Sequence, residues 1–312
     1  MFKIKLILKF IITKTNLLIK KNNFLIIFRY GSAIGDHICL TGVISKIYNK
    51  KLKIIVCSNY PELFYNNPKI FKIINLNKFL FKKILLKFLH VFEGESIKSY
   101  RNRIIQTKKY HFMKFYPKNL HFGFASAYHF DIDMNYKNFS NEIFLNEKEI
   151  SVYKNKIKLP NSYALIHSQA KKTFMKNKDW GPEKIQTIVN EFKNINWIQV
   201  GQPDEIILNN TYACYYDLTL RELGYLIYNS KFIVSMEGMF NHMASAFNKK
   251  NFLIHTGVLP LESINYPNNI VIEKNSELKC YPCFSFNCID HKKHNDENLT
   301  VDYAINIIKK NF

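Results

Sequence analysis

The sequence predicts an α/β fold in which parallel strands alternate with helices. Three observations indicate this class. First, the apolar run Phe24–Phe28 leads through a glycine-containing bend into a segment with helical periodicity. Second, beyond Pro160, strand-like and helix-like segments alternate at the spacing of a parallel sheet with helices on both faces. Third, 312 residues are enough for two domains that each have a full core.

The first predicted unit surrounds Asp36, the first acidic residue of the chain. Phe24–Phe28 has the length and composition of a buried strand, and apolar residues recur at helical spacing over His37–Asn49. Leu52–Cys57 has the character of a second strand and completes a β-α-β unit. Asp36 therefore lies where open α/β sheets place functional groups, at the carboxyl end of the first strand. A carboxylate that caps the helix would occupy the same position.

The second half begins after a predicted linker over Lys154–Pro160. Pro182 suits the first position of a helix, and the capping box Thr219–Glu222 predicts another helix start. A closing amphipathic helix is expected over Thr300–Lys310. The predicted strands are Tyr163–His167, Trp197–Gly201, Lys231–Met236 and Asn251–Gly257.

Polar side chains collect where these strands end. Loops at the carboxyl ends of parallel strands offer backbone N–H groups and a helix dipole to a phosphate, and a lysine adds a point charge. Taken singly, each of these residues is more typical of capping or of a solvated surface; together they predict a nucleotide-diphosphate site. They are Ser168, Gln169, Lys178, Gly201, Glu237, Gly238 and His242.

The net charge of +21 favours anionic partners. The sequence has no arginine-rich block of the kind that nucleic-acid modules carry, so phosphate-bearing small molecules and anionic lipid are expected rather than nucleic acid. Residues 1–22 contain six lysines opposite an apolar face, and residues 63–92 contain six more without an acidic residue. Residues 1–22 are predicted to lie on an anionic membrane surface, or equally to dock on the protein's own core.

Lysines interrupt every apolar run before it reaches the roughly 18 residues of a membrane span. No cleavage site follows the basic N-terminal segment, and the six cysteines are therefore expected to be reduced thiols in the cytoplasm. The sequence predicts a cytoplasmic protein that is peripheral on the inner face of the membrane.

Several segments between Phe24 and Gly257 resemble, in order, the motifs of family 9 glycosyltransferases, the bacterial heptosyltransferase family. They are Arg29–Asp36, His167–Ala170, Lys178-x-Trp180 with Pro182, Val200–Glu205 and Ser235–Ala246. The resemblance implies a GT-B architecture, in which two doubly wound Rossmann-like domains face each other across a cleft. The expected division is an N-terminal segment over residues 1–22, an acceptor domain over 23–155 and a donor domain over 156–312.

The resemblance also implies an inverting, metal-independent glycosyltransferase without a cofactor. It would move a heptose or related sugar from a nucleotide-diphospho-sugar to a lipopolysaccharide- or lipooligosaccharide-type acceptor of the cell envelope. The family's general base falls on Asp36, and its donor-phosphate lysine falls on Lys178. The acidic donor residue and the histidine fall on Glu237 and His242, although Glu237-Gly238 departs from the usual D-S/T-G.

The remaining expected donor contacts are Ser168, Gln169, Gly201 and Gly238, and the expected acceptor contacts are Arg29 and Ser32. A non-catalytic GT-B relative that binds nucleotide-sugar or glycolipid is the alternative. The carboxylate of Asp36 favours the enzyme, because a degenerate relative would have no need to keep it.

Two further patterns have the residue types of metal sites. Cys280-x-x-Cys283-x₄-Cys288, with His291 and His294 after it, has zinc-ligand residue types at unusually short spacing. We expect packed, reduced thiols there rather than a metal. Asp131-Ile132-Asp133 is a D-x-D pair of the kind that binds divalent ions, but it does not clearly follow a strand. No metal site is therefore predicted.

Overall fold

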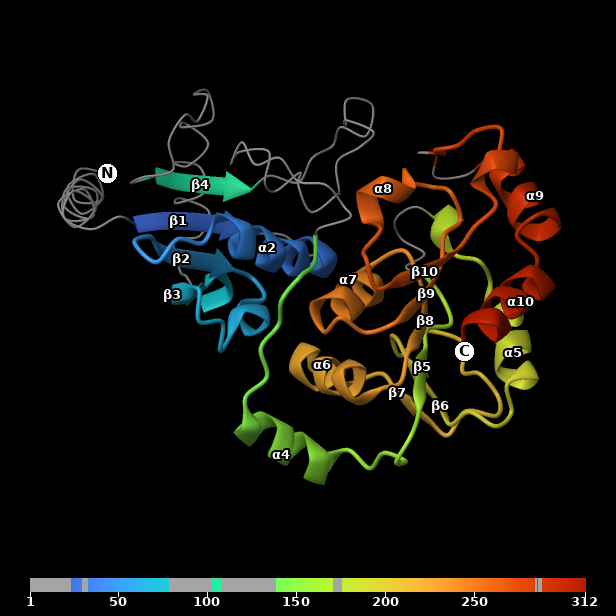
Figure 1. Cartoon of the computed structure of the whole chain (residues 1–312), viewed down its shortest axis with the longest axis horizontal. Helices are drawn as coiled ribbons and strands as arrows, with labels where there is room; N and C mark the ends of the chain where they lie inside the picture. Colours follow the sequence, from blue (N-terminus) through green and yellow to red (C-terminus); the bar gives the residue numbers. More distant parts are fainter. Residues whose placement is uncertain are drawn as a thin grey trace.

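In the computed structural model, the described residues are 24–29, 33–78, 103–107, 139–170, 176–283, 285 and 288–312. They form two parallel β-sheets with accompanying helices, so the predicted α/β class is confirmed (Figure 1). Three sequence-based predictions lie outside the described residues: the basic segment 1–22, most of the basic stretch that ends at residue 92, and the Asp131–Asp133 pair. Ser32 lies outside them as well.

The first sheet has the strand order β3-β2-β1-β4, with every pairing parallel. Its strands are β1 (Phe24–Arg29), β2 (Lys53–Ser58), β3 (Ile70–Asn75) and β4 (Arg103–Thr107). Its helices are α2 (Ile34–Ile47) and the 3₁₀ turns η1 (Pro61–Phe64) and η2 (Leu76–Lys78). The interior strand β1 is apolar because β2 and β4 flank it and its side chains Leu25 and Ile27 are fully buried.

The second sheet has the order β10-β9-β8-β5-β6-β7 and is also parallel. Its strands are β5 (Ala164–Ile166), β6 (Trp197–Val200), β7 (Ala213–Tyr215), β8 (Ile233–Met236), β9 (Asn251–Ile254) and β10 (Asn269–Ile272). Its helices are α5 (Pro182–Glu191), α6 (Leu220–Asn229), α7 (Met239–Ala246), α8 (Leu261–Ile264), α9 (Ile289–Glu297) and α10 (Val301–Asn311), with 3₁₀ turns η8 (Lys176–Lys178) and η9 (Asn275–Glu277).

The predicted linker is partly helical. Helix α4 (Glu147–Lys156) begins at a capping box formed by Asn146 and Glu149 and ends inside the expected linker Lys154–Pro160. None of its residues is fully buried, and only Ile150 and Tyr153 pack against the apolar core, so its helical periodicity is weak. The division of the chain at residue 156 stays a prediction.

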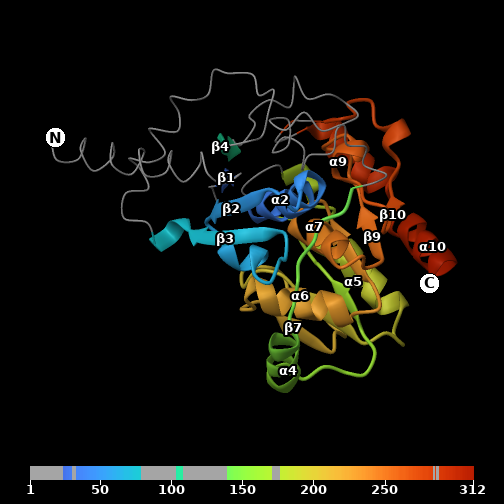
Figure 2. The ribbon, with the colours of Figure 1, turned by 60° about the vertical axis from the view of Figure 1, so that its left-hand side comes forward.

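The two sheets are joined by a direct contact between α2 and α7, which lie side by side in both ribbon views (Figures 1 and 2). One apolar cluster contains Ile38 and Val43 from α2 and Met243 and Ala244 from α7. Gly42 permits close approach on another side of α2, because a Cβ there would lie 2.5 Å from the carbonyl oxygen of Ser140. The carboxyl end of β1 is thereby held against the second half of the chain.

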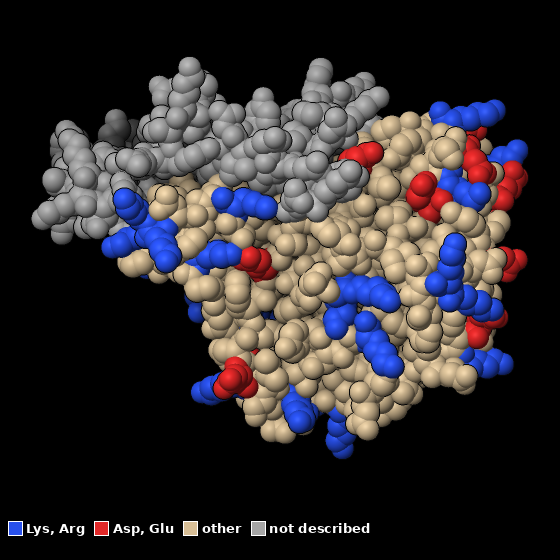
Figure 3. All heavy atoms as spheres, viewed as in Figure 1, with Lys and Arg blue, Asp and Glu red and all other residues tan. Residues whose placement is uncertain are grey.

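No helix among the described residues is long and apolar enough to cross a bilayer. Lysine and arginine side chains are spread over much of the face seen in Figure 3, whereas several of the fewer acidic side chains lie along the right-hand edge of the view. This distribution agrees with the strongly positive charge of the sequence.

A buried arginine connects α6 to the first half of the chain. Arg221 donates from Nε and Nη2 to the two carboxylate oxygens of Glu149 at 2.9 and 2.7 Å. It also donates from Nη2 to the carbonyl oxygen of Phe144 at 2.6 Å and from Nη1 to that of Glu62 at 3.3 Å. Removing one partner from such a network leaves polar groups unsatisfied inside the protein.

We therefore expect Arg221→Met to lower the free energy of unfolding by about 3 kcal/mol. The control is Lys293→Met, which removes an exposed lysine 3.9 Å from Glu297 and should cost less than about 1 kcal/mol. Urea unfolding followed by circular dichroism measures both. Equal losses in the two variants would contradict a structural role for the Arg221 network.

Candidate active site

The predicted donor residues lie at one edge of the second sheet. Strands β8, β5 and β6 are neighbours and run parallel, so their carboxyl ends lie at the same edge. Ser168 and Gln169 follow β5, Gly201 follows β6, and Glu237 follows β8. The tertiary structure therefore brings together residues that are up to 69 positions apart in the sequence. This is the edge at which open α/β sheets bind ligands.

The loops after β5 and β6 are bonded to one another. Gln169 Oε1 accepts from the Ile206 backbone N–H at 2.7 Å, and Ser168 Oγ donates to Glu205 Oε2 at 3.3 Å. A Cβ on Gly201 would meet the Glu205 carboxylate, so the absence of a side chain at Gly201 lets that carboxylate lie against the loop. Ser168 and Gln169 are buried. Their side chains hold the two loops in shape.

Glu237 is a fully buried carboxylate at the end of β8. Its Oε2 lies 3.5 Å from Lys178 Nζ, and its Oε1 lies 3.1 Å from His255 Nε2. Among the described residues neither carboxylate oxygen has a hydrogen-bond partner. The N–H at His255 Nε2 is 3.0 Å from the carbonyl oxygen of Leu259, which can only accept. A buried carboxylate whose oxygens accept no hydrogen bond is costly, and a ligand hydroxyl would offset that cost.

Trp180 anchors the segment that carries Lys178. Its backbone N–H contacts the sulfur of Met236 at 3.3 Å, and its indole Nε1 donates to the carbonyl oxygen of Leu299 at 2.8 Å. Pro182 then begins α5 directly after Gly181. These contacts hold the end of η8 against the end of β8, which explains why Lys178 lies beside Glu237.

Asp36 lies in the first turn of α2, just beyond the carboxyl end of β1. Its carboxylate forms an ion pair with Arg29, whose side chain is 2% exposed, whereas that of Asp36 is 19% exposed. Among the described residues, no side-chain cap hydrogen bond is present at the start of α2, where Ala33 is the N-cap residue. The structure thus pairs Asp36 with Arg29, and no capping contact of Asp36 is present in the described part of this turn.

His242 joins the two halves of the site. Its Nδ1 lies 2.6 Å from the hydroxyl oxygen of Tyr266 and 3.5 Å from Cys39 Sγ. A Cβ on Gly35 would lie 2.7 Å from Cδ2 of the same ring, so Gly35 allows α2 to approach α7 closely. Asn141 Nδ2 donates to the Tyr266 hydroxyl at 3.0 Å and to the His242 carbonyl oxygen at 3.0 Å. The ring therefore lies next to the segment that carries Asp36.

Burial, together with the positive charge of Lys178, lowers the pKa of His242 to about 3. Burial also raises the pKa of the Cys39 thiol to about 12. Both groups are consequently neutral at physiological pH. Neither can supply a charge to a ligand, and the ionic groups of the site are Asp36, Arg29, Lys178 and Glu237.

The depressed pKa of His242 predicts a stability that falls with acidification. The unfolded chain takes up a proton near pH 6.5, whereas the folded protein does not do so until about pH 3. Stability is therefore lost as the pH falls through this window, by about 1.4 kcal/mol for each full pH unit. We expect His242→Gln to reduce the change in unfolding free energy between pH 7.5 and 5.5 by about 1.4 kcal/mol. Urea titrations at the two pH values measure the unfolding free energies of both proteins. If that free energy changes with pH by the same amount in the variant and the wild type, the prediction is contradicted.

Sequence reasoning missed three residues of this site. His255 follows β9, which ends at Ile254, whereas the predicted strand continued to Gly257, so the strand-end argument that identified Ser168 did not select it. Cys39 lies one helical turn after Asp36, on the same face of α2. Tyr266 lies in a loop with no periodic signal, so its contact with His242 could be recognised only in the folded structure.

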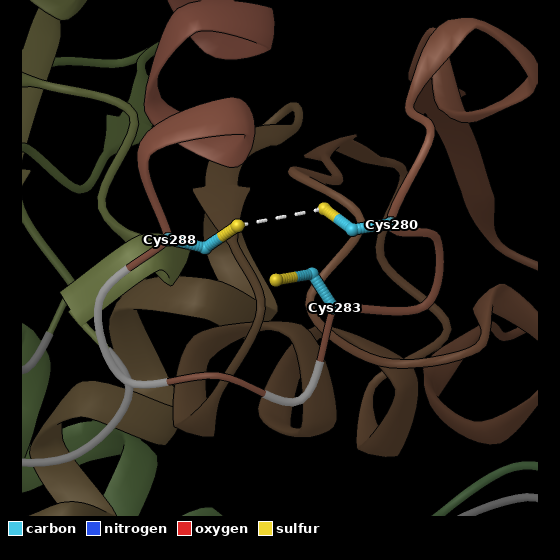
Figure 4. Close-up of side chains that lie close together, drawn as sticks. All are labelled: Cys280, Cys283 and Cys288. Carbon is cyan, nitrogen blue, oxygen red and sulfur yellow. Dashed lines mark hydrogen bonds between the residues drawn. The ribbon is translucent and has the colours of Figure 1, made fainter.

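Away from the residues described above, three cysteines of the described part of the chain lie close enough together to hold a metal ion. The sulfur atoms of Cys280, Cys283 and Cys288 lie within 4.8 Å of one another, and Figure 4 shows them directed toward a common centre. The tertiary structure thus brings the three cysteines together.

The sequence matches no protein-family model and no curated protein. Solved structures are similar over most of the chain. The iron-containing dodecameric glycosyltransferase TibC from enterotoxigenic E. coli has a TM-score of 0.65 and 14% identity, covering 93% of this chain and 76% of that one. TibC in complex with ADP-D-β-D-heptose has a TM-score of 0.61 at the same identity and coverage.

Two further structures show the same similarity. A family 9 glycosyltransferase from Veillonella parvula has a TM-score of 0.61 and 12% identity, covering 81% of this chain and 86% of that one. The E. coli ADP-heptose lipopolysaccharide heptosyltransferase II has a TM-score of 0.59 and 12% identity, covering 92% and 98%. The chain therefore has a GT-B-like fold. Its structural neighbours include heptosyltransferases of family 9, as the sequence motifs predicted.

Proposed function

We propose that the protein is an inverting glycosyltransferase that uses a nucleotide-diphospho-sugar donor. The observation that carries the proposal is the arrangement around His242. Gly35, the residue before Asp36, approaches this ring on one side, and the Lys178–Glu237 pair lies at the edge of the second sheet from which α7 begins. A base and a phosphate-binding cation are thus presented by two sheets that pack against each other, within a GT-B-like fold.

The proposed mechanism needs only groups of this chain. The Asp36 carboxylate accepts the proton of an acceptor hydroxyl while that oxygen attacks the anomeric carbon. The bond from the anomeric carbon to the phosphate oxygen breaks, and the nucleoside diphosphate leaves from the opposite face with the bonding electrons. Lys178 and the backbone N–H groups at the helix starts stabilise the growing negative charge. Arg29 holds the base in place, since a base must lie within hydrogen-bond reach of the proton that it takes.

The buried carboxylate of Glu237 indicates where the nucleotide-sugar donor would bind. Its carboxylate oxygens accept no hydrogen bond from the described residues, which suits them to accept from the hydroxyls of a ribose or sugar. Ser168, Gln169, Gly201 and Gly238 shape the loops around the diphosphate, and Arg29 and Ser32 are the proposed acceptor contacts. TibC and heptosyltransferase II are described with ADP-heptose, which supports a heptose or related sugar and a lipopolysaccharide- or lipooligosaccharide-type acceptor.

Thermal unfolding in the presence of ADP-, UDP- and GDP-linked sugars tests the donor. A ligand that binds only the native state at a hundredfold excess over its Kd adds about 2.7 kcal/mol of stability. We expect one nucleotide-sugar to raise Tm, and we expect mass spectrometry of a lipooligosaccharide acceptor to show the addition of one sugar. Binding without transfer to any acceptor would instead support the non-catalytic alternative. No shift with any nucleotide-sugar would contradict both.

The proposal places the protein on the inner leaflet, where a lipid-linked acceptor would lie. The twelve lysines of residues 1–22 and 63–92 are the basis for this expectation. Each can contribute about 1 kcal/mol to the free energy of binding when it lies near an anionic surface. We expect binding to anionic vesicles at low salt that weakens as salt rises, and little binding to neutral vesicles. Deleting residues 1–22 should weaken this binding while preserving transfer to a soluble acceptor. A full-length protein that ignores anionic vesicles at low salt would exclude the membrane assignment.

A further inference from the structure

We propose that Cys280, Cys283 and Cys288 bind one thiophilic divalent metal ion, zinc or iron(II), at a structural site in the second half of the chain. We call these three residues the cysteine cluster. They come from the segment between η9 and α9, and Cys288 is the residue directly before α9. The proposal concerns a site distinct from the groups assigned to sugar transfer and holds whether or not the proposed function is correct.

The spacing of the sulfur atoms fits a metal ion. All three lie within 4.8 Å of one another, and the sulfurs of Cys280 and Cys288 are 3.7 Å apart. Two thiolates bound at about 2.3 Å to a tetrahedral zinc ion lie about 3.8 Å from each other. A disulfide would instead need a sulfur–sulfur distance of about 2.05 Å. Figure 4 shows the three side chains converging from two sides of the loop, as ligands around one centre do.

The ligand type selects the metal class. Thiolates are soft ligands that favour zinc and iron over magnesium or calcium, which prefer oxygen. Each thiol that coordinates the ion releases its proton to solvent. No other described Cys, His, Asp or Glu joins the three sulfurs, so a small exogenous ligand such as water would complete a tetrahedral ion.

Hydrogen bonds of the loop indicate what the ion would stabilise. The Cys283 backbone N–H donates to the carbonyl oxygen of Gly257 at 2.9 Å, and the Tyr281 hydroxyl accepts from the Leu261 N–H at 2.9 Å. Both partners lie in the stretch from β9 to α8 that also carries His255.

The loop that carries the cysteine cluster also contacts η8, the segment that places Lys178 beside Glu237. The carbonyl oxygen of Ser285 accepts from Asn177 Nδ2 at 3.2 Å, and Asn177 is the neighbour of Lys178. An ion held by the cysteine cluster would therefore brace both segments that place partners beside Glu237. Its role is structural, because no described contact connects the sulfurs directly to Asp36 or Lys178.

The test measures metal and stability, and it does not depend on sugar transfer. Full-length protein is purified under reducing conditions, reconstituted with zinc or iron(II), and analysed for metal by mass spectrometry. We expect close to one ion per chain in the wild type. Cys280→Ser, Cys283→Ser and Cys288→Ser should each reduce the content to background. The matched control is Cys214→Ser on β7, which removes a partly buried cysteine outside the cluster and should leave the metal content unchanged.

Two further measurements keep the proposal testable if a variant fails to fold. Wild-type protein reconstituted with cobalt(II) should show thiolate-to-metal charge-transfer absorption, and metal should protect the three cysteines, but not Cys214, from alkylation. Chelation should lower the Tm of the wild type. Any of three results would overturn the proposal. Wild-type protein would hold no metal after reconstitution, or the cluster variants would hold as much metal as Cys214→Ser. Alternatively, protein alkylated at lysis would contain a Cys280–Cys288 disulfide.

Discussion

Replacing Asp36 with Asn is expected to lower kcat by roughly a hundred- to ten-thousand-fold while the Kd of the nucleotide-sugar donor stays the same. Asparagine keeps the size of the side chain but cannot take the proton of the acceptor hydroxyl. Asp36 is placed at the end of β1, and Glu237 is placed at the end of β8. In the proposed mechanism the base acts at the acceptor end, so its loss should leave the donor contacts intact.

The control for this variant is Asp302→Asn, which makes the same change on an exposed residue of α10 and should leave kcat unchanged. Initial rates with saturating acceptor give kcat, and titration calorimetry with the donor alone gives Kd. Because Asp36 pairs with the buried Arg29, Tm should be measured as well, to separate lost chemistry from lost folding. A folded variant that keeps a sizeable fraction of wild-type turnover would show that Asp36 is not the base.

Replacing Glu237 with Gln is expected to weaken donor binding by about ten- to a hundredfold. Hydrogen bonds to a charged group contribute about 1.5–3 kcal/mol, compared with about 1 kcal/mol for neutral pairs. The carboxylate is fully buried between Lys178 and His255, so its charge is little screened by solvent. The amide keeps the volume and offers a single accepting oxygen, which should cost affinity while the core around β8 stays packed.

The Glu237→Gln effect should appear in the Kd of the donor and should be absent from acceptor binding. The comparison variant is Glu262→Gln on α8, an acidic residue for which no ion pair is present among the described contacts. Combining Glu237→Gln with Lys178→Met completes a double-mutant cycle for the pair that is 3.5 Å apart. If the donor Kd of Glu237→Gln equals that of the wild type, the carboxylate is a structural partner of Lys178 only.

Local chemistry was sufficient to predict most of the elements. The apolar run before Asp36, the proline that begins α5 and the capping box at Thr219 are features of neighbouring residues, and the structure contains β1, α5 and α6 there. Strands β3, β4, β7 and β10 and helices α4, α8 and α9 were not predicted. Strand β7 has three partly exposed residues, and α4 has no fully buried residue, so each has only a weak apolar pattern.

The candidate site was predicted as residue types at strand ends, because the carboxyl ends of parallel strands lie at one edge. By itself the sequence therefore determined the α/β class, the alternation of those strands and helices that it predicted, and residues that lie at that edge. It also contains the motifs that pointed to the fold of family 9 glycosyltransferases.

Only the tertiary structure decided which of these side chains meet. It paired Asp36 with Arg29 and buried Glu237 between Lys178 and His255. It set His242 against Tyr266 and Cys39, and it brought three cysteines within reach of one ion. The physical reason is that burial and charge pairing depend on helices and loops packing across the two sheets, whereas periodicity and capping depend on residues within one turn of each other.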